Sequence, residues 1–398
     1  MPSKKILIIA EVFSENLGDG VIYESLRNSI IKNHPKYIIN KIDLSGNKDW
    51  CSHISTSTST STSTSTSTIL LQKLKKIPIL KKIYYTYNWY AKTQKACFPD
   101  WVFQIKNSDA IVIGGGQLFT DNNFGFPPKI FDVYRLCKKY KKPLYILGCG
   151  VGDHWSLPAK FMYQKVINYA RFISVRDESS RKNIFKYTKV NSVTHPDFGF
   201  SINRNNLISK ENEGSILYLN LQPLEDFKYF VPTLKELTES AYFDFWENII
   251  KVCYCNYQIS LITNGHIDDY NVVVRLYNRL LANGYEKVTL QPRATKPDEL
   301  IEQIKNCNYI ISTRMHAGII AYSLGKCVIP ISWDQKVNNV WLEMTNRSDI
   351  VLDSSVLNKK LTLSEIESLF NNSIKAQGTN LKNAINTIDE ILKNNLTY

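Results

Sequence analysis

Three residues in the last third of the chain, Arg314, His316 and Lys336, combine the side chains needed to bind an anion and to move a proton. An arginine can hold a phosphate or a carboxylate with two parallel hydrogen bonds, and an imidazole can donate or accept a proton near neutral pH. All three residues follow apolar runs that are predicted to be buried. Three cationic or titratable side chains grouped in this way are typical of a phosphate or carboxylate site. The alternative is structural, with Arg314 in an ordinary salt bridge between domains and His316 as a helix cap.

The segment around these residues predicts the elements that would position them. Residues 309–311 and 327–332 are short apolar runs typical of buried strands, and residues 316–324 have a helical pattern that ends at a glycine. Open α/β sheets bind ligands beyond the carboxyl ends of their strands, where a helix N-terminus also attracts anions. We therefore expect all three side chains at one such edge.

The composition indicates a globular protein long enough for two domains. The 398 residues are 43% hydrophobic, and no run of 18 apolar residues occurs, so neither disorder nor a transmembrane helix is expected. The apolar run at the N-terminus soon reaches Glu11, which favours a first buried strand over a signal peptide. Eight cysteines without paired spacing favour reduced thiols and a cytoplasmic location. The net charge of +13 favours an anionic partner: a phosphorylated metabolite, a lipid phosphate, a membrane or nucleic acid.

Glycine-containing loops follow two strands predicted in the first part of the chain. The first strand leads into a loop with Asn16 and Asp19, and a later strand ends in three glycines that include Gly115 and Gly116, shortly before Asp121. Glycines at such turns allow close approach of another backbone or of a ligand. Neither loop matches a dinucleotide-binding or ATP-binding motif. Asp19 is explained equally well as a helix cap or as a catalytic carboxylate.

Two segments between these loops differ from the rest of the chain. Residues 55–68 are an unbroken Ser-Thr alternation, which lacks apolar side chains and predicts a solvated loop that can be shortened without loss of the fold. Residues 69–97 hold seven lysines and several aromatic residues but no Asp or Glu. This composition favours a surface that meets anionic lipid or a lipid-linked glycan. The alternative is a pair of solvated helices whose aromatic side chains pack on the domain.

Strands alternate with helices twice, before and after a polar gap near residues 203–214. The pattern predicts an α/β protein of two doubly wound, Rossmann-like domains facing a central cleft. We place these domains at 1–203 and 204–352. Residues 353–398 contain two amphipathic patterns, which predict C-terminal helices packing across the domain junction.

Six short motifs, in this order, resemble those of the polysaccharide pyruvyl transferase family, whose fold is similar to that of GT-B glycosyltransferases. The resemblance runs from about Lys4 to Met344 and leaves out residues 55–68. Its motifs are Asn16-Leu-Gly-Asp19, Asp109-Ala-Ile-Val-Ile-Gly-Gly-Gly-Gln-Leu-Phe, Ser174-Val-Arg176-Asp177-Glu178-Ser179, His195-Pro-Asp197, Arg314-Met-His316-Ala and Trp333-Asp-Gln-Lys336. The family commonly has Tyr-Asp before the last lysine, and Trp333 replaces that tyrosine here.

The resemblance implies a transferase of cell-surface polysaccharide or lipopolysaccharide biosynthesis. Such an enzyme moves the enolpyruvyl-derived group of phosphoenolpyruvate onto two hydroxyls of a sugar and forms a pyruvate ketal, with no metal and no cofactor. We expect a galactose-type acceptor, whose carrier is left open between a lipid, a nucleotide and a polymer. We expect no nucleic-acid partner, and contact with the cytoplasmic face of the membrane through residues 69–97.

The domain at 204–352 would bind the donor. Phosphoenolpyruvate carries a phosphate and a carboxylate, so fixed cations are needed to hold it. We assign Arg314 and Lys336 to these two groups and Arg176 as a further contact across the cleft, with its pairing to Asp177 as the alternative. His316 is the expected general acid, because protonation of carbon near neutral pH favours a donor that titrates there.

The domain at 1–203 would bind the acceptor. Asp19 and Asp121 are the candidates for orienting or deprotonating the sugar hydroxyl, and Asn16, Gly115 and Gly116 are expected to line the substrate site. Two other functions compete with this one. A GT-B glycosyltransferase using a nucleotide sugar would share the fold and the basic site, and a glycan- or membrane-binding protein would have lost catalysis.

Overall fold

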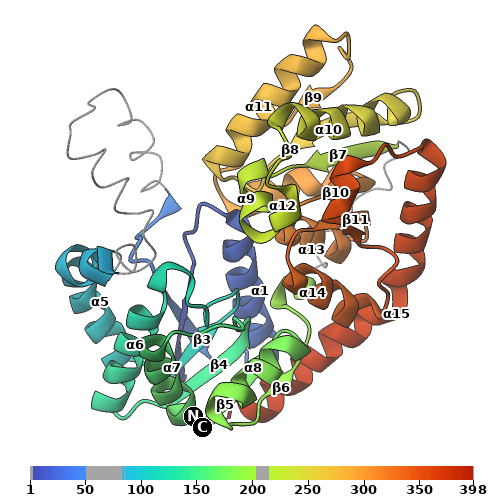
Figure 1. Ribbon diagram of the computed structural model, residues 1–398. Helices are drawn as coiled ribbons and strands as arrows, with labels where there is room; N and C mark the ends of the chain where they lie inside the picture. Colours follow the sequence, from blue (N-terminus) through green and yellow to red (C-terminus); the bar gives the residue numbers. More distant parts are fainter. Residues whose placement is uncertain (1–2, 51–82, 85, 203–214, 398) are drawn as a thin grey trace, which may run out of the picture. The chain divides into compact units, whose positions relative to one another are not determined.

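The computed structural model describes residues 3–50, 83–84, 86–202 and 215–397, apart from the side chains of 123 and 375–379 (Figure 1). The Ser-Thr alternation and most of the basic stretch after it therefore lie outside the described residues. The chain divides into two compact domains. The first comprises Met1–Ser14, Ile22–Phe198 and Ile388–Tyr398, and the second comprises Glu15–Val21 and Gly199–Thr387.

The first domain is built on a six-stranded sheet in the order β2-β1-β3-β4-β5-β6, with parallel pairing throughout. Its strands are β1 (Lys5–Ala10), β2 (Ile38–Asp43), β3 (Ala110–Gly114), β4 (Leu144–Cys149), β5 (Phe172–Val175) and β6 (Val193–Thr194). Its helices are α1 (Leu17–Asn33, whose first residues group with the second domain), η2 (Trp89–Thr93), α5 (Gln94–Lys106), η3 (Asn122–Phe124), α6 (Pro127–Lys139), α7 (Leu157–Tyr169) and α8 (Glu178–Thr188).

Alternating side chains of these strands fill two cores, one on each face of the sheet. Leu7 and Ile9 belong to the core that includes α5, α6 and α7, whereas Ile6 and Ile8 belong to the core that includes α1. A strand points successive side chains to opposite faces, so a continuous apolar run such as β1 is what a sheet covered on both faces requires.

The second domain repeats this design with the sheet order β12-β11-β10-β7-β8-β9, again all parallel. Its strands are β7 (Ile216–Asn220), β8 (Gln258–Ile262), β9 (Thr289–Leu290), β10 (Tyr309–Ser312), β11 (Cys327–Ser332) and β12 (Leu352–Asp353). Its helices are η4 (Phe198–Ser201, which begins at the last residue of the first domain's central segment), α9 (Leu224–Phe230), η5 (Pro232–Leu234), α10 (Glu239–Cys253), α11 (Ile267–Ala282), α12 (Pro297–Lys305), α13 (Met315–Ser323), α14 (Gln335–Thr345), η6 (Ser354–Asn358) and most of α15 (Leu363–Asn395).

These two sheets confirm the predicted class of two doubly wound α/β domains. In both sheets the strand order reverses once, between β1 and β3 in the first and between β7 and β10 in the second. Ligands of open α/β sheets bind beyond the carboxyl ends of the strands at such a reversal. The loops that follow these four strands are therefore the first places to look for a site.

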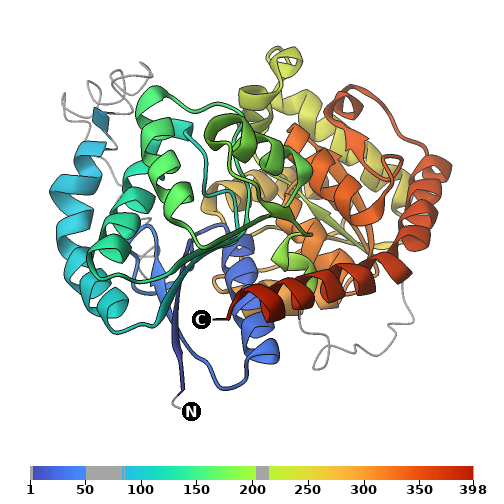
Figure 2. The ribbon, with the colours of Figure 1, turned by 90° about the horizontal axis from the view of Figure 1, so that it is seen from below.

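Helix α15 differs from the two C-terminal helices expected from the sequence, because it is one continuous helix of 33 residues. Its last part groups with the first domain, where Ile388, Leu392 and Leu396 join the core that contains α1 (Figure 2). Asp389 accepts hydrogen bonds from Lys32 at 2.6 Å and from Asn33 at 2.7 Å in that same domain. The predicted cleft between the domains stays a prediction.

Two further expectations concern the surface and the cysteines. Within the described ranges, no helix has the length and apolarity needed to cross a membrane. The seven cysteines of the described part form no disulfide with one another. Trp89, from the end of the basic stretch, is buried and donates a hydrogen bond of 3.1 Å to Asp132 on α6, so this aromatic residue packs on its own domain. Membrane contact by the stretch stays a prediction.

Candidate active site

The candidate active site lies at the carboxyl edge of the second sheet, where its strand order reverses. Helix α13 begins directly after β10, and Arg314 is the residue that caps it. The loop that leads into α9 follows the neighbouring strand β7. Three side-chain hydrogen bonds fix this edge: Asn220 donates to the Ile262 carbonyl at 3.2 Å, Ser312 donates to Asn220 at 2.8 Å and Thr313 donates to the Asn220 carbonyl at 3.2 Å.

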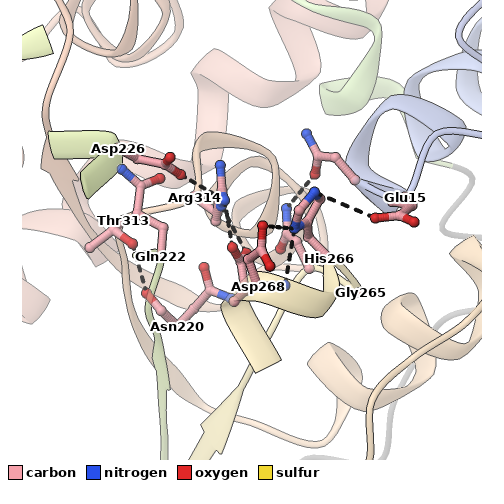
Figure 3. A network of polar contacts seen from close by, with 12 residues as sticks. Glu15, Asn220, Gln222, Asp226, Gly265, His266, Asp268, Thr313 and Arg314 are labelled. Carbon is pink, nitrogen blue, oxygen red and sulfur yellow. Dashed lines mark hydrogen bonds and ion pairs between the residues drawn. The ribbon is translucent and has the colours of Figure 1, made fainter. Parts of the chain in front are cut away.

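Arg314 is held by two carboxylates (Figure 3). Its Nε and Nη2 atoms donate to both oxygens of Asp269, at 2.8 and 2.5 Å, and Nη2 also donates to Asp226 at 3.0 Å. Burial disfavours the charge of Arg314, but the two carboxylates outweigh that cost and raise its pKa above the ordinary value. The Asp269 side chain is fully buried, whereas that of Asp226 is 42% exposed. The two partners therefore differ in how easily they could give way to a ligand.

His316 lies in the first turn of α13 and faces the segment Asn16–Asp19. Its Nδ1 atom is 3.8 Å from a carboxylate oxygen of Asp19, which is an ion pair when the imidazole is protonated. A Cβ atom added at Gly18 would lie 2.3 Å from the Cβ of His316. Only a glycine at position 18 therefore lets the backbone come this close to the histidine. The structure thus brings together His316 and Asp19, which are 297 positions apart in the sequence.

The segment with Asp19 is fastened to the second domain by the loop after β8. The Leu17 amide donates to the Asn264 carbonyl at 3.0 Å, and the Asn264 side chain donates to Asn16 at 3.2 Å. His266, which also lies in the loop after β8, is 3.5 Å from Glu15 (Figure 3). Helix α1 begins at Leu17, so it includes residues that the sequence predicted to lie in a loop. Asp19 falls in its first turn, where a negative charge favours the helix dipole.

Lys336 lies at the start of α14, after β11, and stacks on aromatic rings. Its ammonium is 4.4 Å from the centre of Trp333 and 5.2 Å from that of Phe230, and 3.5 Å from the carboxylate of Asp334. The indole of Trp333 donates to the Thr313 carbonyl at 2.7 Å, which ties this loop to the one that carries Arg314. Helix α9 supplies a partner for each cation: Asp226 for Arg314 and Phe230 for Lys336.

The candidates from the first domain have local partners of their own. Gly115 and Gly116 both have positive φ, at 73° and 67°, and the Gly115 amide donates to the Leu147 carbonyl at 3.0 Å. A Cβ atom at Gly115 would lie 2.5 Å from the Ile22 side chain of α1. Gly115 therefore allows close packing of the Ile22 side chain against the turn. Approach of a ligand to Gly115 and Gly116 stays a prediction.

Arg176 is 1% exposed and pairs with Asp197 at 3.1 Å, with Asp177 a further 3.8 Å contact. It follows β5, two strands away from the reversal in the first sheet. The pairing with Asp177 named as its alternative is present only as the longer contact, because Asp177 caps α8 by accepting from the Ser180 amide and Asp197 is the main partner. Contact of Arg176 with a ligand stays a prediction.

Asp121 is 8% exposed and accepts a hydrogen bond of 2.7 Å from the amide of Ser156, the residue before α7. The carboxylate thus stabilises the start of a helix, and a contact with the acceptor sugar stays a prediction. No cluster of three or more His, Cys, Asp or Glu side chains in the described segments is arranged to hold a metal ion.

Sequence reasoning missed the carboxylates and the amide that surround Arg314. Asp226 and Asp269 lie in the first turns of α9 and α11, where acidic residues are common for purely local reasons. Gln222 follows β7 and is fully buried. The one available signal is position: all three follow strands that end at the same sheet edge, but only the strand order shows that these ends are neighbours.

Comparison with known proteins agrees with this architecture. The model of the family described as "Polysaccharide pyruvyl transferase" matches residues 16–335, most of the chain. The chain belongs to the polysaccharide pyruvyl transferase family. The match begins at Asn16 and includes Asp19, Arg314 and His316, and it ends one residue before Lys336.

A curated relative adds a biological setting. The amylovoran biosynthesis protein AmsJ of Erwinia amylovora is 23% identical over 279 residues, which cover 64% of this chain and 65% of that protein. The match thus spans slightly less than two thirds of the relative's length. Its name assigns AmsJ to the biosynthesis of amylovoran.

Solved structures of similar fold include a UDP complex and a protein described as an epimerase. The MnaA–UDP complex of S. aureus aligns with a TM-score of 0.53 at 12% identity, covering 99% of this chain and 97% of that one. A protein described as a putative UDP-N-acetylglucosamine 2-epimerase from Listeria monocytogenes gives 0.54 at 12% identity, with coverage of 98% and 95%. At these identities the likeness shows the two-domain fold alone.

Proposed function

We propose that this polysaccharide pyruvyl transferase family member is a ketal pyruvyltransferase with phosphoenolpyruvate as donor and a sugar of a cell-surface polysaccharide as acceptor. One observation carries the proposal: Arg314 and His316, separated by one residue, lie at the strand-order reversal, with Asp19 beside the imidazole. An acid, an anion-binding fork and a carboxylate are the groups that this chemistry requires.

The reaction can be written with these residues. His316 protonates the methylene carbon of the enol, which places positive charge on the neighbouring carbon, and a sugar hydroxyl adds there while Asp19 accepts its proton. A second hydroxyl then attacks the same carbon and the carbon–oxygen bond to phosphate breaks, which closes the ketal. The proton of that hydroxyl passes to His316 and the proton held by Asp19 leaves with the phosphate, so the products are the pyruvylated sugar and inorganic phosphate and both residues are restored. Arg314 and Lys336 hold the anionic groups of the donor, and Asp19, 3.8 Å from the Nδ1 atom of His316, orients the imidazole before the first step.

The test measures phosphate release from phosphoenolpyruvate in the presence of a panel of galactosides, including lipid-linked and nucleotide-linked ones. His316→Ala should lower turnover by about 10²- to 10⁴-fold, the usual contribution of a general acid, while the melting temperature stays near that of the wild type. His34→Ala is the matched control, because His34 lies in the first domain, where it contacts the Leu392 carbonyl, and has no part in the reaction. Turnover by His316→Ala at the wild-type rate would remove this residue from the mechanism.

The competing function is a glycosyltransferase that uses a nucleotide sugar, because the two-domain fold does not by itself decide between the two activities. The same acceptor panel incubated with nucleotide sugars separates the two functions. Release of a nucleoside diphosphate, with no phosphate released from phosphoenolpyruvate, would favour the glycosyltransferase.

A further inference from the structure

A buried side-chain amide, that of Gln222, lies beside Arg314. Gln222 is 0% exposed, and neither its side-chain nitrogen nor its side-chain oxygen has a hydrogen-bond partner among the described residues. Burying such a group without a partner costs about 1–3 kcal/mol. An unsatisfied group of this kind in a folded protein calls for a ligand, an ion or a water as its partner.

The backbone of Gln222, which carries the amide, is held in place by hydrogen bonds. Tyr242, itself buried, donates a hydrogen bond of 2.8 Å to the Gln222 carbonyl, and Asn220 fastens the same strand end to both neighbouring strands. In Figure 3 the Gln222 side chain points toward Asp226 and Arg314. An amide donor on a fixed backbone next to a guanidinium is an arrangement that can bind an anionic oxygen pair.

The two carboxylates on Arg314 have different roles. Asp269 accepts from two nitrogens of the guanidinium and is fully buried, so it fixes the orientation of the arginine. Asp226 accepts from one nitrogen only, is 42% exposed, and is carried by the seven-residue helix α9. Replacing Asp226 on that nitrogen requires a modest movement of a partly exposed side chain, whereas replacing Asp269 would strand a buried charge.

We propose that Gln222 and Arg314 form a carboxylate subsite, in which the carboxylate of the donor takes the place of the Asp226 carboxylate and accepts a second hydrogen bond from the Gln222 amide. This inference rests on the proposed function for the identity of the donor. Asp226 is then a competitor that occupies the subsite when no donor is bound. Gln222 is a binding residue, and Asp269 is a positioning residue that acts through Arg314.

The subsite makes opposite predictions for two neighbouring residues. Gln222→Met keeps the length of the side chain and removes an unpaired buried amide, so the melting temperature should stay the same or rise, while the donor binds about tenfold more weakly or worse. Asp226→Asn weakens the competitor, so the donor should bind about threefold more tightly or better. A purely structural role for Gln222 would instead lower stability and leave binding unchanged.

The experiment is calorimetric titration of the full chain with phosphoenolpyruvate, and separately with inorganic phosphate and with pyruvate, in the absence of acceptor. The variants are Gln222→Met, Asp226→Asn and, as the matched control, Asp268→Asn. Asp268 is 69% exposed and its carboxylate lies near His266, not Arg314, so its removal tests for a general effect of charge. The expected result is a change in affinity for phosphoenolpyruvate and pyruvate in the two test variants, with phosphate affinity unchanged.

Each other outcome contradicts a stated part of the proposal. Wild-type affinity for phosphoenolpyruvate in both test variants would overturn the subsite and leave the proposed function standing. An equal change in phosphate affinity would show that the subsite does not bind the carboxylate. An equal gain in affinity for phosphoenolpyruvate in Asp268→Asn would show that Asp226 acts only through its negative charge and does not occupy the subsite. A wild-type protein that binds no phosphoenolpyruvate would overturn the proposed function together with the subsite.

Discussion

The two domains each place an arginine after a parallel strand and surround it with aspartates, yet the two arginines have different environments. Arg176 is 1% exposed, and its main partner Asp197 is equally buried. The Arg314 side chain is 19% exposed, and one of its two partners reaches solvent. Arg176 follows a strand away from the reversal of its sheet, whereas Arg314 follows a strand at the reversal. The same residue type therefore pairs with a fully buried carboxylate in one domain, whereas in the other it shares its charge between a buried and a partly exposed carboxylate.

The largest effect that would sharpen this comparison is on stability. Arg176→Met leaves Asp197 charged and buried without its main partner, and breaking such a pair costs about 3–5 kcal/mol. Chemical denaturation should show this loss in the first domain. Arg181→Met is the matched control from the next helix, because Arg181 forms a surface pair with Glu178 and its loss should have no measurable effect. Equal stability of the two variants would contradict a structural role for Arg176.

Arg314→Lys should affect donor binding more than folding. A lysine keeps the charge that Asp269 requires but cannot reproduce the planar fork, so the KM for phosphoenolpyruvate should rise about tenfold or more. The melting temperature should change by a few degrees at most. Arg275→Lys is the control, since Arg275 pairs with Glu239 at the surface. If Arg314→Lys unfolded the second domain and left the KM unchanged, the two arginines would have the same role.

A pair of glycines extends the comparison to the backbone. A Cβ atom at Gly18 would lie 2.3 Å from that of His316, and one at Gly150 would lie 2.8 Å from the Nε of Arg176. Overpacking of this kind costs about 1–3 kcal/mol. Gly18→Ala should lower kcat through the displaced histidine, whereas Gly150→Ala should lower the melting temperature and leave the activity per folded molecule unchanged. Loss of kcat in Gly150→Ala alone would reverse the assignment of the two edges.

The smallest expected effect is a pH dependence confined to the first domain. Burial lowers the pKa of His195, which accepts or donates a 3.0 Å hydrogen bond with Ser174 and contacts the Pro196 carbonyl. The unfolded chain takes up a proton at about pH 6.5, before the folded chain does, so stability should decline as the pH falls below that value. Above it the contribution is fully present. His195→Gln should remove this part of the acid sensitivity, and an unchanged pH profile would show that another group titrates.

The sequence was sufficient to predict the strand, turn and helix that carry Arg314 and His316, because apolar runs and a terminal glycine are local signals. The two-domain fold could be predicted from the alternation of strands and helices. The sequence assigned Arg314 to the donor and named an ion pair as the alternative for Arg176, but it could not show the surroundings of either side chain. The aspartates on Arg314 come from distant segments, and the strand order that places Arg314 at a reversal comes from pairing between distant segments rather than from any local pattern.

The partners of Arg314 were out of reach for the same reason. Asp226 and Asp269 are local helix-start residues by sequence, and Gln222 is one polar residue in a loop. Their significance depends on burial and on a common neighbour. Asp19 was named from its loop, but its meeting with His316 required the first turn of α1 to dock on the loop after β8, which no spacing in the sequence indicates.

The distal end of α15 bears on how the molecule is made. Ile388, Leu392 and Leu396 complete a core whose other members come almost entirely from the first 150 residues. While the ribosome is still translating the second domain, the first therefore has one apolar face of its sheet without part of its cover. Its folding can finish only after residue 396 has left the exit tunnel, so any release of the nascent chain before that point would leave an unfinished first domain exposed to chaperones and proteases.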